Sequence, residues 1–199
     1  MKNVVVILFK DFETLDVFGP VEILGRLKDH FRLRFISQPG GIITSTQSVP
    51  VVTEAISRIY GSCQILLIPG GLGVVNLISD ERFINDLKCL AQSAEYVLTV
   101  CTGSLLLAKT GLLSGRKATS NKRLFAWAAQ ESADVDWVKK ARWVKDGHIY
   151  TSSGVSAGID MTLGFVADLL GYDVARQQSI EIEYDWKEDA GWDPFSEIY

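Results

Sequence analysis

The residue in this sequence best suited to covalent chemistry is Cys101, which follows a short apolar run and precedes a helix-forming one. A cysteine at a strand-to-helix turn is lifted out at the edge of a sheet, like the nucleophile in the elbow of serine hydrolases. The N–H groups and dipole of the following helix favour a negative sulfur. We therefore predict a reactive thiol whose thiolate is populated near neutral pH. The alternative is a buried structural cysteine.

A glycine pair stands at the end of a neighbouring apolar run, where a backbone without Cβ atoms can approach a ligand closely. The pair is Gly70-Gly71, in the segment Ile68-Pro69-Gly70-Gly71. With the N–H group of Thr102, their N–H groups are predicted to bind an oxyanion formed when Cys101 attacks. The alternative is a tight turn with no role in chemistry.

Three carboxyl groups, those of Glu13, Asp16 and Glu22, follow the first apolar run. We expect them near the sheet edge that carries Cys101, where a carboxyl group can hydrogen-bond the sulfur or handle a proton. Asp16 is predicted to do so because it stands in an apolar frame that gives a charge little other purpose. The alternative is that these groups complement a helix dipole.

Neither histidine supports a Cys–His dyad, because His30 and His148 are both predicted to lie on the surface, remote from the sheet edge. The cysteines are odd in number and widely separated, which indicates neither a disulfide framework nor a zinc site. Cys63 and Cys89 are predicted to be structural, Cys89 within the apolar stripe of a helix. This usage is typical of the reducing cytoplasm, which we expect as the location.

Short β-branched runs alternate with amphipathic stretches along the chain. The predicted strands are 4–9, 31–36, 65–68 and 96–100, with a hairpin of 141–145 and 148–152 and a small β excursion around Ser48. The predicted helices span 18–27, 81–94, the run after Cys101 and 156–170. This alternation predicts an open, mostly parallel α/β sandwich with ligands at the carboxyl ends of its strands. The acidic, aromatic tail 181–199 is expected to pack over the body or across a subunit boundary.

The composition is that of an ordinary globular protein: 199 residues, 47% hydrophobic, with a net charge of -4. We expect one domain over residues 1–199. The longest apolar runs are too short to span a bilayer, so no membrane span is predicted. No small-residue cleavage site follows the N-terminal apolar run 4–9, so no signal peptide is predicted. Without a basic cluster, nucleic acid is not an expected partner.

Four segments together resemble the ThiJ/PfpI superfamily, which has the class I glutamine amidotransferase-like fold, over nearly the whole chain. They are 15–22, 68–71, Val100-Cys101-Thr102-Gly103-Ser104 and 151–160, and the first predicted strand shares the resemblance. Asp16, Cys101-Thr102 and the Ser-Gly-x-Ser-Ala-Gly-Ile-Asp segment are most similar to the isonitrile hydratase branch. The resemblance implies a flavodoxin-like three-layer sandwich with a mostly parallel central sheet, a homodimer, and hydration of a small isonitrile substrate to an N-substituted formamide with no metal or organic cofactor.

The resemblance also implies a role for each site residue. Cys101 would be the nucleophile or covalent anchor, Asp16 would activate water or protonate the substrate carbon, and Thr102 would support the thiolate or the intermediate. Protease-like members carry a histidine where this chain has Thr102, and many relatives carry a His-Trp pair where it has Thr119-Ser120-Asn121-Lys122. Asn121 can hydrogen-bond substrate but cannot relay protons as imidazole does. Protease and glyoxalase activities are therefore disfavoured.

Two functions without turnover remain as alternatives. The same fold forms the sensor half of helix-turn-helix regulators in this superfamily, and we expect no such module after Tyr199, so this alternative is a stand-alone ligand or redox sensor. The other alternative is a stress-protective protein whose Cys101 is oxidised to sulfinate.

Overall fold

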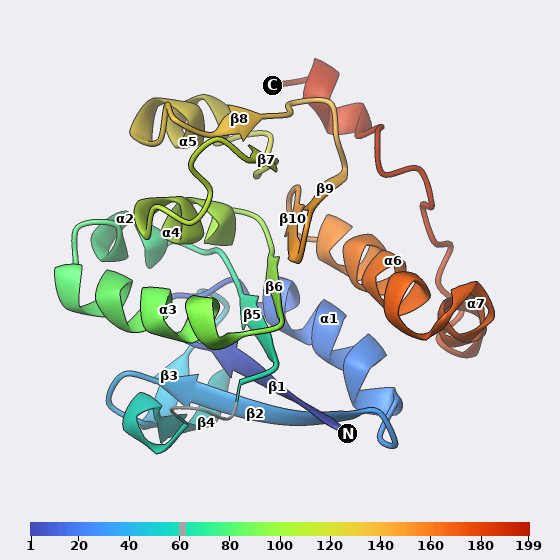
Figure 1. Ribbon diagram of the computed structural model, residues 1–199, viewed down its shortest axis with the longest axis horizontal. Helices are drawn as coiled ribbons and strands as arrows, with labels where there is room; N and C mark the ends of the chain where they lie inside the picture. Colours follow the sequence, from blue (N-terminus) through green and yellow to red (C-terminus); the bar gives the residue numbers. More distant parts are fainter. Residues whose placement is uncertain (60–62) are drawn as a thin grey trace.

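The computed structural model describes residues 1–59 and 63–199 and has an eight-stranded sheet at its centre, in the order β3-β4-β2-β1-β5-β6-β10-β9 (Figure 1). The strands are β1 (Lys2–Ile7), β2 (Phe31–Ser37), β3 (Gly41–Thr44), β4 (Pro50–Ala55), β5 (Ile65–Ile68), β6 (Tyr96–Thr99), β9 (Trp143–Asp146) and β10 (Ile149–Ser152). The outermost pairs, β3 with β4 and β9 with β10, are antiparallel, and the pairs between them are parallel. The predicted mostly parallel sheet, the hairpin and the β excursion are confirmed.

Helices cover both faces of the sheet and complete three layers (Figure 1). On one face lie α1 (Thr14–Arg26) and α6 (Ala157–Leu170), with α7 (Tyr172–Glu181) packed on α6. On the other lie α2 (Val74–Leu77), α3 (Glu81–Ser93) and α4 (Gly103–Lys109). Beyond α4 lie α5 (Phe125–Glu131) and a small sheet of β7 (Lys117–Ala118) and β8 (Asp136–Trp137), while η1 (Ile56–Arg58) and η2 (Pro194–Glu197) are single 3-10 turns. The flavodoxin-like sandwich is thus confirmed.

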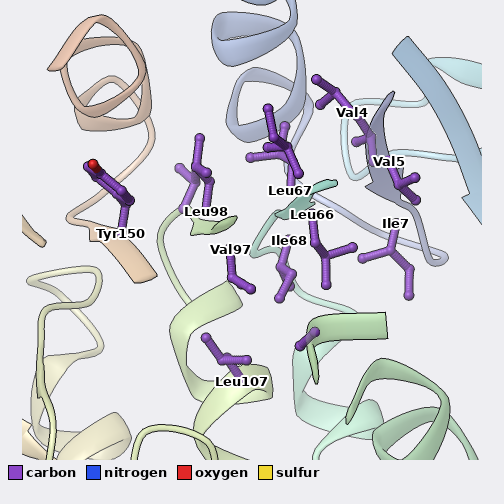
Figure 2. Packing of buried hydrophobic residues seen from close by; sticks show 14 of the residues in the cluster. Val4, Val5, Ile7, Leu66, Leu67, Ile68, Val97, Leu98, Leu107 and Tyr150 are labelled. Atoms are coloured by element: carbon purple, nitrogen blue, oxygen red, sulfur yellow. The ribbon is translucent and has the colours of Figure 1, made fainter. Parts of the chain in front are cut away.

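The core lies on both faces of the central strands, as Figure 2 shows for side chains of β1, β5 and β6. Every residue of β5 and β10 is buried. A strand covered by helices on both sides has no solvent face, which is why β5 reads as a continuous apolar run rather than as an alternating one. None of the helices among the described residues is both long and apolar enough to cross a membrane.

Helix α1 begins at Thr14 rather than at Phe18, and Pro20 lies inside it. The prediction of a later start was wrong because it allowed proline only in the first turn. Pro20 removes the N–H that would bond the Asp16 carbonyl, but the helix is held by tertiary packing. Gly19 lies so close to α6 that an added Cβ would be 2.7 Å from Ile159 Cγ1. The earlier start places Asp16 in the first helical turn.

The structure also tests the predictions for the two histidines, the other two cysteines and the C-terminal tail. His30 and His148 are exposed and Cys63 is buried, as expected. Cys89 is exposed, so its predicted place in the apolar stripe was wrong; α3 buries Phe83, Leu87, Leu90 and Ala91, and Cys89 falls outside that face. The tail packs over the body: Ala190 O accepts from Arg142 N (2.8 Å) and from Trp143 N (3.3 Å) at the edge strand β9.

Candidate active site

Cys101 occupies a strained turn between β6 and α4, with a backbone φ of 58°. This left-handed conformation is unfavourable for a residue with a Cβ and persists only where surrounding contacts hold it. The Cys101 N–H donates to Ser153 O (3.0 Å), and its carbonyl accepts from Ser104 Oγ (3.0 Å) and Ser120 Oγ (3.1 Å). The predicted strand-to-helix elbow at Cys101 is therefore confirmed, and hydrogen bonds from three separate segments hold it in place.

Asp16 is fully buried, and its two carboxyl oxygens differ in their partners. Oδ2 accepts from the Gly70 N–H (2.9 Å), whereas Oδ1 has no hydrogen-bond partner among the described residues. Burial raises the pKa of Asp16 to about 8, with the Glu13 charge adding to the rise and the Gly70 N–H and the Cys101 thiol opposing it. Asp16 is thus a carboxylic acid that keeps its proton at neutral pH.

The Cys101 sulfur accepts a hydrogen bond from Asn121 Nδ2 (3.1 Å). The amide is oriented by Leu124, whose N–H donates to Asn121 Oδ1 (3.2 Å) and leaves Nδ2 facing the sulfur. Burial raises the pKa of the Cys101 thiol well above its ordinary value and the Asp16 charge raises it further, while the Thr102 N–H, the Asn121 amide and the Thr102 hydroxyl lower it in part. Asn121, predicted as a substrate-binding residue, lies against the sulfur itself.

The prediction of a populated thiolate near neutral pH is wrong for the free protein. Cys101 is buried and lies beside a carboxyl group, and both effects disfavour a negative sulfur. The helix expected to stabilise the thiolate, α4, spans only Gly103–Lys109, so its dipole is small. At neutral pH the site holds a thiol next to a protonated carboxyl.

The predicted oxyanion hole is also corrected, because the glycine N–H groups are already used. The Gly70 N–H bonds Asp16, and the Gly71 N–H donates to Thr102 Oγ1 (3.2 Å). Gly70 is required for this close approach, since a Cβ there would lie 2.5 Å from Thr102 Oγ1 and 3.0 Å from Asp16 Oδ2. Of the three N–H groups, it is that of Thr102 that acts on the Cys101 sulfur. The glycines therefore position Asp16 and Thr102.

A cavity of about 290 Å³ opens onto the sulfur. Its lining includes Cys101, Thr102 and Asn121, with a largely apolar wall of Leu72, Val75, Leu124, Trp127 and Val155. Asp16 lies behind this lining. Of the other two carboxyl groups considered, Glu13 lines the cavity, while Glu22 is exposed and pairs with Arg26 (3.4 Å). The lining thus combines this apolar wall with two charged residues, Glu13 and Arg123.

Sequence reasoning missed the residues that support the elbow from a distance, Ser153 and Ser120. Ser153 follows β10, which pairs in parallel with β6, so both strands end at the same edge and Ser153 O meets the Cys101 N–H. The motif Ser152-Ser153-Gly154 was visible, but its neighbour in the sheet was not. Trp127 in the cavity wall carried no signal in the sequence that would have marked it as a lining residue.

Comparisons with known proteins show the family and the fold of this chain. The model of the DJ-1/PfpI family matches residues 2–168. The isonitrile hydratase of Pseudomonas putida is 31% identical over 180 residues, which are 89% of this chain and 76% of that protein. The HTH-type transcriptional regulator CdhR of Pseudomonas aeruginosa is 27% identical over 161 residues, 80% of this chain and 47% of the regulator. A crystal structure of a ThiJ/PfpI family protein from Pseudomonas syringae matches with a TM-score of 0.84 at 27% identity, covering 92% of this chain and 75% of that one.

Proposed function

Because this chain belongs to the DJ-1/PfpI family, we propose that it is a cofactor-independent enzyme that hydrates a small isonitrile to an N-substituted formamide. The likeness to the Pseudomonas putida isonitrile hydratase supports the reaction. The observation that carries it is the neutral pair of Cys101 and Asp16 beside an apolar cavity. An isonitrile carbon becomes electrophilic only when protonated, so its hydration needs an acid and a sulfur nucleophile together.

In the first step Asp16 is the acid. Its pKa of about 8 keeps the carboxyl protonated at neutral pH, and Oδ1 carries the proton because Oδ2 is held by Gly70. Transfer of that proton to the isonitrile carbon gives a nitrilium ion and a carboxylate. The Cys101 sulfur then adds to this carbon while its own proton passes to Asp16. The products are a thioimidate on Cys101 and a restored carboxylic acid.

In the second step water adds across the carbon–nitrogen double bond, with its hydroxyl on carbon and its proton on nitrogen. The tetrahedral intermediate collapses by breaking the carbon–sulfur bond, and the hydroxyl proton returns to sulfur. One water is consumed and the formamide is released. The Asn121 amide and the Thr102 N–H, both acting on the sulfur, stabilise the negative charge that it carries as it leaves.

The test is formamide production from cyclohexyl isocyanide by the wild type, Cys101→Ser and Cys89→Ser. Cys89 is an exposed cysteine on α3 and serves as the matched control. We expect wild-type turnover to persist in Cys89→Ser and to fall by about a thousandfold or more in Cys101→Ser, because a hydroxyl is a far weaker nucleophile. A serine variant that stays active would exclude the covalent mechanism.

The likeness to a transcriptional regulator supports a second candidate, a ligand sensor that uses the same cavity. Absence of turnover in the wild type, with small molecules still binding to the Cys101 cavity in calorimetry, would favour this candidate. A peroxide sensor is less well supported, because oxidation proceeds through the thiolate and the pKa of Cys101 is raised by burial.

A further inference from the structure

A second cavity, of about 270 Å³, adjoins the Cys101 cavity. The two share Asn121, Arg123 and Val155 in their linings, so the amide that contacts the sulfur also faces the second space. Figure 1 shows the C-terminal tail running from α7 past the β9 end of the sheet to η2, and Asp193, Phe195 and Tyr199 of this tail close the cavity. The cavity is therefore placed to receive the far end of a molecule whose reacting end lies at Cys101.

The two buried cations of this cavity already have partners. Lys122 is only 3% exposed, and its Nζ donates to Thr119 Oγ1 (2.7 Å), Ala141 O (2.7 Å) and Ser120 O (3.4 Å). Arg142 pairs with Asp160, with Nη2 2.6 Å from Oδ2. The main donors of both cations are thus engaged within the protein.

Unlike the two cations, Asp193 has a side-chain atom without a hydrogen-bond partner among the described residues. Its side chain is buried, and Oδ1 accepts from the Phe195 N–H (3.0 Å) at the start of η2. Oδ2 is buried and has no hydrogen-bond partner within residues 1–59 and 63–199. Asp193 acts on Lys122 only as a charge, without an ion pair between them in the described structure. An acceptor left bare in this way costs free energy until something donates to it.

We propose that the second cavity binds the far end of the substrate through an uncharged hydroxyl group that donates to Asp193 Oδ2. This inference rests on the proposed function and names its substrate class: isonitriles whose substituent carries a terminal hydroxyl. An ammonium group is disfavoured because the lining holds three basic residues, Lys122, Arg123 and Arg142, against the single acid Asp193. The apolar wall of the first cavity contacts the alkyl chain between the two ends.

The proposal is tested by calorimetry with two unreactive formamides. They are N-(6-hydroxyhexyl)formamide, which carries a terminal hydroxyl, and N-hexylformamide, which does not. We expect wild-type protein to bind the hydroxylated compound about tenfold more tightly, the contribution of one hydrogen bond to a charged acceptor. Asp193→Asn should reduce this ratio, because its oxygen must still accept from the Phe195 N–H and its NH₂ group can then only donate to the ligand hydroxyl as a neutral partner, without the charged acceptor. Asp193→Ser is a second variant. Its hydroxyl can still cap η2 by accepting from the Phe195 N–H, but it has no counterpart of Oδ2.

The control is Asp185→Asn, an exposed residue of the same tail, which should leave the ratio unchanged. Equal wild-type affinity for the two compounds, a ratio that survives in both Asp193 variants, or no binding of either compound would each overturn the proposal. Because binding is measured without turnover, absence of isonitrile hydration would count against the proposed function alone. A matching preference in kcat/KM for hydroxyhexyl over hexyl isocyanide would connect the two.

Discussion

Asp16 and Asp160 are both fully buried acids in the first turns of the adjacent helices α1 and α6, yet their surroundings differ. Asp160 Oδ2 accepts from Arg142 Nε (2.7 Å) and the Tyr184 hydroxyl (3.2 Å), and Oδ1 accepts from the Lys187 N–H (2.9 Å). The Asp16 Oδ2 accepts from the Gly70 N–H, and its Oδ1 has no partner among the described residues. Burial raises the pKa of each acid, and for Asp160 the Arg142 cation opposes the rise.

When two acids are both fully buried, their hydrogen-bond partners distinguish the structural acid from the reactive one. The Asp160 carboxylate is paired, and it joins β9 to the tail through Arg142 and Lys187. Asp16 retains a proton, an oxygen without a partner in the described part of the chain and a thiol neighbour, which is the set of properties expected of a proton donor. Removal of Asp160 should therefore lower the stability of the protein, whereas removal of Asp16 should lower its turnover.

The largest expected effect is on stability. Asp160→Ala leaves the Arg142 guanidinium buried without a counter-charge, which should lower the free energy of unfolding by about 3–5 kcal/mol. The measurement is urea unfolding followed by tryptophan fluorescence. Lys145→Ala, which removes the half-exposed ion pair with Asp168, is the control and should cost less than about 1 kcal/mol. Equal losses in the two variants would contradict the structural role of Asp160.

Next in size is the loss of turnover in Asp16→Asn, by about a hundredfold or more, because the amide cannot supply the proton. Its oxygen can still accept from Gly70, so the fold should persist, which urea unfolding checks. Glu22→Gln on the same helix is the control. Unchanged hydration of cyclohexyl isocyanide by Asp16→Asn would remove Asp16 from the mechanism.

A smaller effect is expected in the pH profile. Asp16 acts in its protonated form and has a pKa of about 8, so kcat/KM should hold constant below that pH and fall as the pH rises through it. The fall should approach tenfold per pH unit, as for loss of one proton. Rates measured from neutral pH to about two units above the pKa test this. A profile that instead rises with pH would indicate that a thiolate is the reactive form.

The smallest effect should come from Glu13→Gln. The Glu13 charge raises the pKa of Asp16, so its removal should lower that pKa and move the alkaline limb of the profile to lower pH, by less than about one unit. The readout is the position of the limb rather than the plateau rate, because Glu13 also lines the cavity. The full pH profile of the variant is compared with that of the wild type, and a shift to higher pH would show that the sign of this interaction is wrong.

Residues whose role depends on local sequence were the predictable ones. The elbow at Cys101 followed from an apolar strand beside a helix-forming run, and Asp16 from a lone charge in an apolar frame. The parallel central strands, the hairpin at Asp146-Gly147 and the bounds of α3 and α6 to within one residue followed in the same way, whereas α2, α5, α7 and the small sheet of β7 and β8 were not predicted. Helix α1 was misplaced at its start because a proline signal is local, whereas the packing of Gly19 on Ile159 that outweighs it is not.

The sequence by itself determined the sandwich, the position of the cysteine at a sheet edge and the presence of an acid beside it, since strand burial and glycine turns are encoded within a few residues. Only the tertiary structure decided the protonation of the pair and the occupation of the glycine N–H groups. Asp16 and Gly70 are 54 residues apart, and Asn121 reaches Cys101 from another loop. Burial and hydrogen bonding between such distant segments set pKa values, and no local pattern records them.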